Sequence, residues 1–128
     1  MKILAAVAFL ALSTTAIAGE GDVYGVKIES LAVIATATGG HLPGNFEIKI
    51  AGGFTLPPHV SCEPLFITTK QSIDPKGRMF ALLQDAVAKQ LTVGLRITDA
   101  PELTAYRGRC SLEVVRFCRE DLPRCGDY

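Results

Sequence analysis

Hydrophobic and polar residues alternate along several segments of this chain, and each such segment predicts a β-strand with one buried face. The alternation is most regular in residues 91–98 and in residues 45–51. Residues 110–118 alternate with one change of phase near the middle, and residues 65–69 are short, apolar and β-branched. Together with a first segment nearer the N-terminus, these stretches predict five strands.

The first strand is expected to begin at Val23 or Tyr24, where apolar positions start to alternate with polar ones. At Ser30 and Leu31 the apolar phase moves by one residue, and Val33 continues the new phase. A shift of one residue exchanges the two faces of a strand, so it predicts a β-bulge or a sharp bend. A long, bent first strand is what a small closed barrel needs if one strand serves two sheets.

Between the third and fourth strands, over residues 74–90, the hydrophobic period changes to that of a helix. Asp74 and Pro75 form a favourable start, with Asp74 as N-cap and Pro75 at the first helical position. One side of the segment carries Met79, Leu83, Ala86, Val87 and Gln90, and the apolar face is widened by Phe80 and Leu82. The segment therefore predicts an amphipathic helix that closes or flanks a barrel.

The order of these segments is strand, strand, strand, helix, strand, strand, which is the order of the OB-fold, a small five-stranded Greek-key barrel. We therefore predict a mainly β protein with one helix and an OB-fold-like barrel. The alternative is an α+β sandwich, in which the helix packs across one face of an open antiparallel sheet.

Residues 1–18 have the features of a secretory signal peptide. Lys2 supplies the positive charge, residues 3–12 the apolar segment and residues 16–18 the small-x-small cleavage motif. The apolar run is too short to span a bilayer, so we expect cleavage after Ala18 rather than an uncleaved anchor. The mature protein would then be secreted or periplasmic, without a membrane span, and residues 19–128 would form a single domain.

Charge and cysteine content narrow the class of protein further. The chain carries 13 Lys and Arg against 13 Asp and Glu, and loss of the leader with Lys2 makes the mature domain slightly acidic. Because nucleic-acid-binding proteins usually present a basic face, nucleic acid is not an expected partner. The cysteines, all outside the leader, are Cys62, Cys110, Cys118 and Cys125.

Four cysteines in a short exported chain predict two disulfides. Three pairings are possible, and we favour Cys62–Cys110 together with a C-terminal clip, Cys118–Cys125. A zinc site is the other use of four cysteines, but the spacings contain no C-x2-C pair.

No motif in the sequence predicts catalysis. His41 and His59 lie in Gly- and Pro-rich turns without a second histidine two or four positions away, so we expect no metal and no cofactor. The chain lacks a G-x-S-x-G nucleophile motif and a phosphate-binding glycine loop followed by a helix. We therefore expect a protein that is not an enzyme. A small hydrolase is the alternative, since a pair of carboxylates needs only geometry.

Two polar loops, residues 39–44 and 99–109, are candidates for a ligand site. In an OB-fold the loops that join strands one to two and four to five flank the ligand face. The candidate binding residues are Tyr106, Arg107, Arg109, Thr68 and Thr69. The tyrosine and the arginines suit stacking on, and hydrogen bonding to, a sugar or a carboxylate. An ordinary solvated hairpin is the alternative for the second loop.

The chain resembles the pentameric B subunits of AB5 toxins, of the subtilase-cytotoxin and pertussis types, and short exported bacterial proteins of the same plan. The resemblance rests on the helix at residues 79–90, the strand at 91–98 and the C-terminal cysteine pair, and it covers the mature chain by element order. It implies an OB-fold, a ring of five copies, recognition of a cell-surface glycan and no catalysis. In a ring, Phe80 and Leu82 are candidates for contacts between copies; a wider core-facing stripe is the alternative.

The partner is left open by the sequence. A cell-surface glycan is the first hypothesis. The second is a periplasmic structural or inhibitor-like protein that acts through one protein partner. No motif of this chain decides between them.

Overall fold

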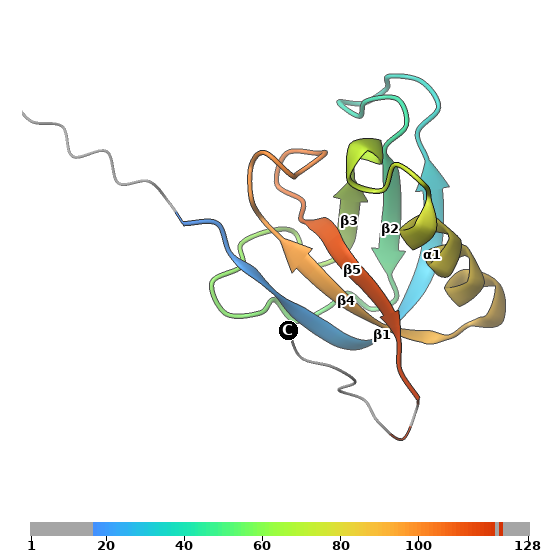
Figure 1. The fold of residues 1–128 in the computed structure, drawn as a ribbon. Helices are drawn as coiled ribbons and strands as arrows, with labels where there is room; N and C mark the ends of the chain where they lie inside the picture. Colours follow the sequence, from blue (N-terminus) through green and yellow to red (C-terminus); the bar gives the residue numbers. More distant parts are fainter. Residues whose placement is uncertain (1–16, 120, 122–128) are drawn as a thin grey trace, which may run out of the picture.

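One five-stranded antiparallel sheet and one α-helix form the part of the chain that the structure describes (Figure 1). The structure is a computed structural model that describes residues 17–119 and residue 121. The elements in chain order are β1 (Glu20–Val33), β2 (Phe46–Ile50), β3 (Phe66–Thr69), the 3₁₀ turn η1 (Gln71–Ile73), α1 (Arg78–Lys89), β4 (Thr92–Thr98) and β5 (Ser111–Phe117). The predicted class, mainly β with one helix between the third and fourth strands, is confirmed.

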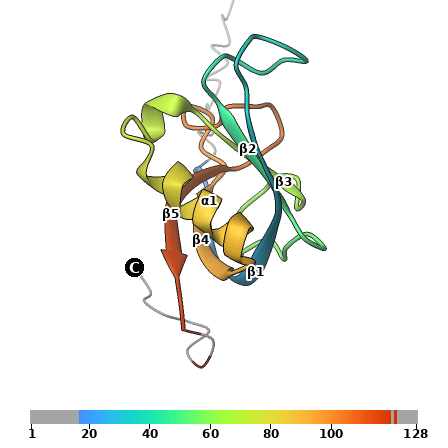
Figure 2. The same ribbon diagram turned by 90° about the vertical axis from the view of Figure 1, so that its right-hand side faces the viewer.

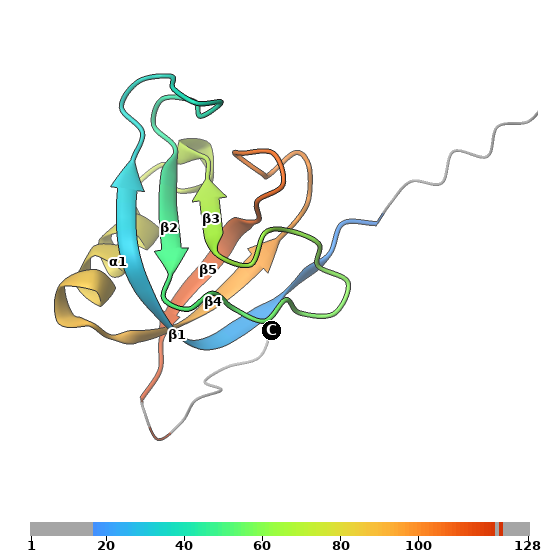
Figure 3. The same ribbon diagram turned by 180° about the vertical axis from the view of Figure 1, so that it is seen from behind.

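β1 is the central strand of a sheet whose order is β3-β2-β1-β4-β5 (Figure 3). Its first half pairs with β4 and its second half with β2. The register with β2 shifts between Ile28 and Ser30, which confirms the bulge predicted from the change of phase. A second shift, against β4, lies between Val23 and Val26, where Gly25 adopts φ 66°. These irregularities let one strand turn from one half of the sheet to the other.

The ends of β1 differ from the prediction. The strand starts at Glu20 rather than at Val23 or Tyr24, because Glu20 already pairs with Thr98 of β4. The pattern gave no sign of this start, since the first residues of β1 are polar or glycine. At the other end Val33, assigned to the apolar phase, is 56% exposed.

The sheet is not closed into a barrel, so the predicted closure was wrong. Its two edge strands, β3 and β5, meet at a single parallel bridge between Ile67 and Cys110, where the Thr68 N–H donates to the Cys110 carbonyl at 3.0 Å. β3 has only four residues and runs at an angle to β5, so no ladder continues from this bridge (Figure 1). The predicted disulfide Cys62–Cys110 is confirmed, and it fastens the chain beside the bridge.

The helix starts later than predicted. It was expected over residues 74–90 with Asp74 as N-cap, but α1 begins at Arg78 after Gly77, whose φ of 63° interrupts the helical path. Asp74 still caps the helix, although it lies four residues before Arg78. Its carboxylate accepts hydrogen bonds from two backbone N–H groups of the first turn, at 2.9 and 3.1 Å, which have no partner within the helix. The charge of the carboxylate also suits the positive end of the helix dipole.

α1 lies against β1 and β5 and covers the core between them (Figure 2). The buried apolar residues of this core on the strands and helix are Val23, Val26, Ile28, Phe46, Ile48, Ile50, Ile67, Leu83, Ala86, Val93, Leu95, Ile97, Leu112 and Val115. Phe80 and Leu82 are partly buried and pack against the same core. Their position favours the core-facing role over a contact between copies.

Some predictions fall outside the described residues. The predicted disulfide Cys118–Cys125 includes Cys125, which lies outside the described residues. Residues 1–16, most of the predicted signal peptide, also lie outside them. Residues 17 and 18, at the edge of the described part, are exposed. Within residues 17–119, no helix is both long enough and apolar enough to cross a membrane.

Candidate functional site

The loop between β1 and β2, the η1 turn and the loop between β4 and β5 lie at the same end of the molecule (Figure 1). We call this region the loop end and define it as residues 34–45, 70–73 and 99–110. Its parts are tied together by an isolated bridge between Thr69 and Thr104 and by a hydrogen bond from Lys70 Nζ to the Glu102 carbonyl, at 2.8 Å. The two loops singled out from the sequence also meet in space, because the ring of His41 stacks on that of Tyr106.

A stack of flat side chains, formed by His41, Phe66, Tyr106 and Arg109, joins the two loops to β3. The rings of His41 and Tyr106 lie 4.2 Å apart between centroids, at an interplanar angle of 28°. The guanidinium carbon of Arg109 lies 4.5 Å from the centre of the Tyr106 ring and 4.6 Å from that of Phe66. Such cation–π and stacking contacts hold the 99–110 loop in one place.

Two carboxylates neutralise Arg109 within the protein. Its Nη1 pairs with Glu47 of β2, and its Nε donates to Glu63 Oε2 at 3.2 Å. The same Glu47 carboxylate accepts a hydrogen bond from Thr68 Oγ1 at 3.2 Å and lies 3.6 Å from His41 Nε2. Because hydrogen bonds between charged groups are the strong ones, Arg109 is committed to this network and is not free to receive a ligand carboxylate.

The five predicted binding residues do not form one site in the structure. Tyr106, Arg109 and Thr68 come together in the stack and its carboxylate network. Thr69 is buried, and its hydroxyl accepts a hydrogen bond from the backbone of Leu112, which is a structural role. Arg107 is exposed and lies apart from the stack. The predicted residues thus build the loop end more than they line an open site.

A hollow of about 260 Å³ lies beside the stack, between the end of the 34–45 loop and η1. It is lined by Leu42, Pro43, Asn45, Lys70, Gln71 and Ser72. Asn45 is only 3% exposed, and its amide nitrogen finds no hydrogen-bond partner among the described residues. Leu42, by contrast, is 59% exposed. A buried donor without a partner is costly, so this amide is a poorly satisfied polar group next to the hollow.

Sequence reasoning missed Asn45 because nothing in its own segment marks it. The residue stands between a glycine turn and a regular strand, and asparagine is ordinary there. Lys70 belongs to a polar stretch at the end of β3 and had no assigned partner. Only the packing of η1 against the 34–45 loop brings the two residues to one hollow.

A larger hollow, of about 570 Å³, opens elsewhere, between the first half of β1 and residues 52–55. None of the buried, unpaired side-chain atoms found in the described part of the chain belongs to its lining. Volume alone does not select a ligand, whereas a few well-placed polar groups do. We therefore take the smaller hollow as the candidate site.

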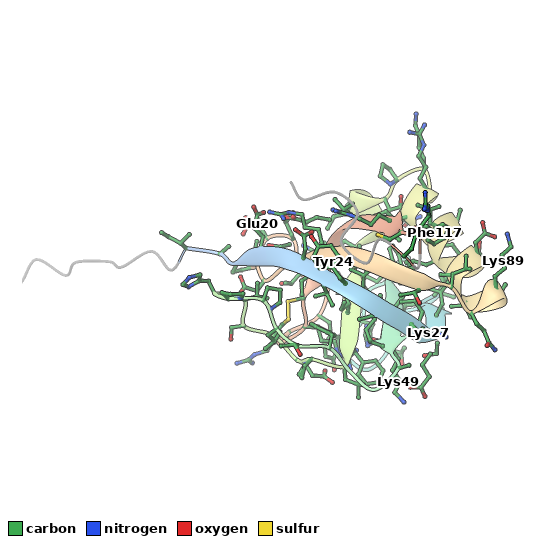
Figure 4. All side chains as sticks on the ribbon, turned by 90° about the horizontal axis from the view of Figure 1, so that it is seen from below. Glu20, Tyr24, Lys27, Lys49, Lys89 and Phe117 are labelled. Carbon is green, nitrogen blue, oxygen red and sulfur yellow. A yellow bond between two sulfur atoms is a disulfide. The ribbon has the colours of Figure 1, made fainter. Side chains whose placement is uncertain are left out.

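A second group of charges lies on β1, β4 and β5, away from the loop end. Arg96 pairs with Glu20 at 2.7 Å, Asp22 at 3.1 Å and Glu113 at 3.5 Å. Glu20 is seen at the start of β1 in Figure 4. The hydrogen bond with Glu20 raises the pKa of Arg96. We call this group the strand cluster.

Glu113 is the perturbed member of the strand cluster. Burial raises the pKa of its carboxyl, the charge of Glu20 raises it further, and Arg96 opposes both effects. Carboxylates gathered around a cation also suggest a metal site, but a search of the described residues for groups of three or more possible metal ligands finds none. The guanidinium already occupies the centre of the strand cluster, so its role is structural.

Comparison of the chain with models of protein families, with curated proteins and with solved structures gives no match. The function must therefore be inferred from the residues of the loop end. The features that bear on it are the hollow, the unpaired Asn45 amide and the stack that fixes the loops around them.

Proposed function

We propose that this chain is an exported, non-catalytic binding module with an OB-fold-like sheet, and that it binds a glycan at the loop end. The element order, with the helix between β3 and β4, and the parallel bridge between the edge strands support the OB-fold-like description. In that fold, the loops that meet here flank the ligand face. The leader-like residues 1–18 and the disulfide Cys62–Cys110 support export.

The observation that carries the proposal is the Asn45 amide, a buried donor without a protein partner on the wall of a hollow. A sugar hydroxyl has the lone pairs to accept from this amide once the Asn45 side chain turns toward the hollow. Lys70 Nζ, which donates one hydrogen bond to the Glu102 carbonyl, has further N–H donors for a second hydroxyl. The apolar edge formed by Leu42 and Pro43 suits the C–H face of a sugar ring.

A glycan array probed with residues 19–128 tests this proposal. Asn45→Asp keeps the shape of the side chain and replaces the donor by an acceptor, so we expect binding to fall by about tenfold or more, the effect of one lost hydrogen bond at a buried site. Leu42→Ser changes an exposed residue of the same hollow and should weaken binding without affecting folding. The matched control is Gln84→Glu, which makes the same change of charge on the exposed side of α1.

The results that would contradict glycan binding are equally definite. They are an array without signal, or a signal that Asn45→Asp and Leu42→Ser leave unchanged. An array without signal together with a monomeric mass in solution would also remove the toxin-like version of the proposal, in which five copies form a ring.

A protein partner is the second candidate, and the exposure of Val33 and Leu42 favours it. These two apolar side chains stand near the two ends of the 34–45 loop, at 56% and 59% exposure. Exposed apolar residues that gather at one place are typical of protein interfaces. Val33→Ser separates the candidates, because Val33 does not line the hollow: it should weaken a protein complex and leave glycan binding unchanged.

A further inference from the structure

The chain passes from exposed to buried between Ala18 and Gly19. Ile17 is 95% exposed and Ala18 is exposed, whereas Gly19 is buried. The Gly19 N–H donates to Asp99 Oδ1 at 2.6 Å, and the Gly19 carbonyl accepts from the Asp99 N–H at 3.0 Å. Gly19 is therefore held on both sides by a residue eighty positions further along the chain.

Asp99 is in turn held by the loop that follows β2. Its Oδ2 accepts a hydrogen bond from the Ser61 N–H at 2.7 Å. This loop passes beside the first residues of β1 (Figure 3). The carboxylate thus joins three segments: the chain before β1, the loop of residues 51–65, and the end of β4. All its partners here are backbone N–H groups.

Glycine is required at position 19. A Cβ at this position would lie 1.9 Å from the carbonyl oxygen of His59, which is backbone and has no room to move aside. The site therefore fits the main chain closely and admits no side chain. Just outside it, Ile17, Ala18, His59, Ser61, Asp99 and Pro101 line a hollow of about 330 Å³.

We propose that cleavage between Ala18 and Gly19 creates an α-ammonium group that forms an ion pair with Asp99, so that removal of the leader completes a binding site for the new N-terminus. The inference rests on the export proposed above. In the cleavage, a leader peptidase adds water across the peptide bond. The Ala18 carbonyl carbon gains the hydroxyl of the water and leaves as a carboxylate. The Gly19 nitrogen keeps its own proton and takes up two more, the second proton of the water and the one that the new Ala18 carboxyl releases, and so becomes –NH3+ at neutral pH.

The ion pair adds charge to a contact that already exists. Before cleavage the Gly19 nitrogen is a neutral amide with one hydrogen, and afterwards it is a cation with three. Hydrogen bonds between charged partners are about twice as strong as neutral ones. Because the nitrogen already lies at 2.6 Å from the carboxylate, the chain does not need to move to gain this interaction.

The pH dependence follows from the groups that face the new terminus. They are Asp99 and His59, which line the same hollow, while the neighbouring Glu20 is paired with Arg96. Asp99 favours the charged amine and so should raise its pKa above the ordinary value of about 7.7–8.0. The stabilisation is then fully present below the ordinary pKa and is lost as the pH rises through the higher pKa of the folded protein.

The test compares chains that start at Gly19 with a free amine and with an acetylated amine. The acetyl carbonyl and methyl take the places of the Ala18 carbonyl and Cα, so the N–H to Asp99 remains and only the charge is lost. At pH 7 we expect the free-amine chain to melt about 4 °C or more above the acetylated one, as one partly buried ion pair does in a domain of this size. The gap should close above pH 10.

Two further measurements keep the test decisive. A chain that starts at Ala18 places its ammonium one residue too early and should melt with the acetylated chain. An NMR titration of the Gly19 α-protons in the unmutated chain gives the amine pKa directly, even if Asp99→Asn fails to fold. Where Asp99→Asn does fold, acetylation should no longer change the melting temperature.

Equal melting temperatures for the free and acetylated chains, or an amine pKa at or below its ordinary value, would overturn the ion pair. N-terminal sequencing of the exported protein tests the maturation step separately: a start at Gly19 supports it and any other start refutes it. Neither result depends on a glycan array, so the failure of glycan binding and the failure of this inference are distinguishable.

Discussion

The loop end and the strand cluster are built around the same kind of group, yet they serve the protein differently. Arg109 and Arg96 are each 17% exposed and each is surrounded by carboxylates. The partners of Arg96 lie on neighbouring strands, where the sheet already places them. Arg109 instead gathers two loops and β3 through rings and carboxylates from distant segments. Arg96 therefore adds ion pairs to a sheet whose strands are already held by backbone hydrogen bonds. Arg109, by contrast, provides the contacts that hold the two loops against β3.

Loss of the disulfide Cys62–Cys110 should produce the largest difference in stability between the loop end and the strand cluster. Replacing Cys62 and Cys110 by alanine opens a loop of 48 residues and should cost about 4 kcal/mol of unfolding free energy, measured by urea titration. Cys110 adjoins Arg109, so hydrogen exchange should accelerate at the loop end before it does in β1 and β4. Equal acceleration in both regions would contradict the comparison.

Removing the arginines one at a time tests the comparison directly. Arg109→Met leaves Glu47 partly buried without its cation and should cost about 2 kcal/mol in urea unfolding. The matched variant Arg96→Met should cost about 1 kcal/mol, because Glu20 is exposed enough to turn to water and Arg116 still pairs with Asp22.

The same two variants can also be compared by their affinity for the ligand. Arg109→Met should also weaken binding at the loop end, since the stack fixes the loop that supports Lys70. Arg96→Met should leave binding unchanged. A larger loss of stability or of binding from Arg96→Met than from Arg109→Met would reverse the assignment of roles.

The smallest effect is expected from Glu113 of the strand cluster. Burial and the charge of Glu20 raise the pKa of its carboxyl in the folded protein, so the native state holds this proton more tightly than the unfolded state does. Stability from this group is present below its ordinary pKa and falls as the pH rises through the raised value. Glu113→Gln should remove that fall and change stability at pH 7 by no more than about 0.5 kcal/mol.

The control for this prediction is Glu29→Gln, which alters an exposed carboxylate paired with Lys49. Its profile of stability against pH should keep the fall assigned to Glu113. If the two variants give the same profile between pH 4 and pH 7, the raised pKa of Glu113 does not contribute to stability.

The same contrast explains which parts of the fold could be predicted from the sequence. The strands of residues 45–51 and 91–98 were found because their alternation is local and a sheet face needs nothing else. The bulge in β1 was found for the same reason. The helix start was misplaced because Asp74 and Pro75 make a good start locally, while the left-handed backbone of Gly77 was not visible in the pattern.

Closure of the barrel and the composition of the site depended on contacts between distant segments. The bridge between Ile67 and Cys110 joins residues far apart in the chain, and the length of β3 decides whether it extends. Tyr106 and Arg109 were singled out from the sequence as binding residues, but the partners that they have inside the protein were not foreseen. Asn45 was missed because its unpaired amide is a property of the packing around it.

The central place of β1 has a consequence for the order of events in the cell. The first strand to be synthesised occupies the middle of the sheet, and its partner β4 begins at Thr92, in the last third of the chain. Contacts of such long sequence separation form late, because the intervening chain must first be closed into a loop. In a nascent chain the second half of β1 can pair early with β2, whereas the first half stays unpaired until β4 has been synthesised. The sheet can therefore be completed only after the last quarter of the chain has been synthesised.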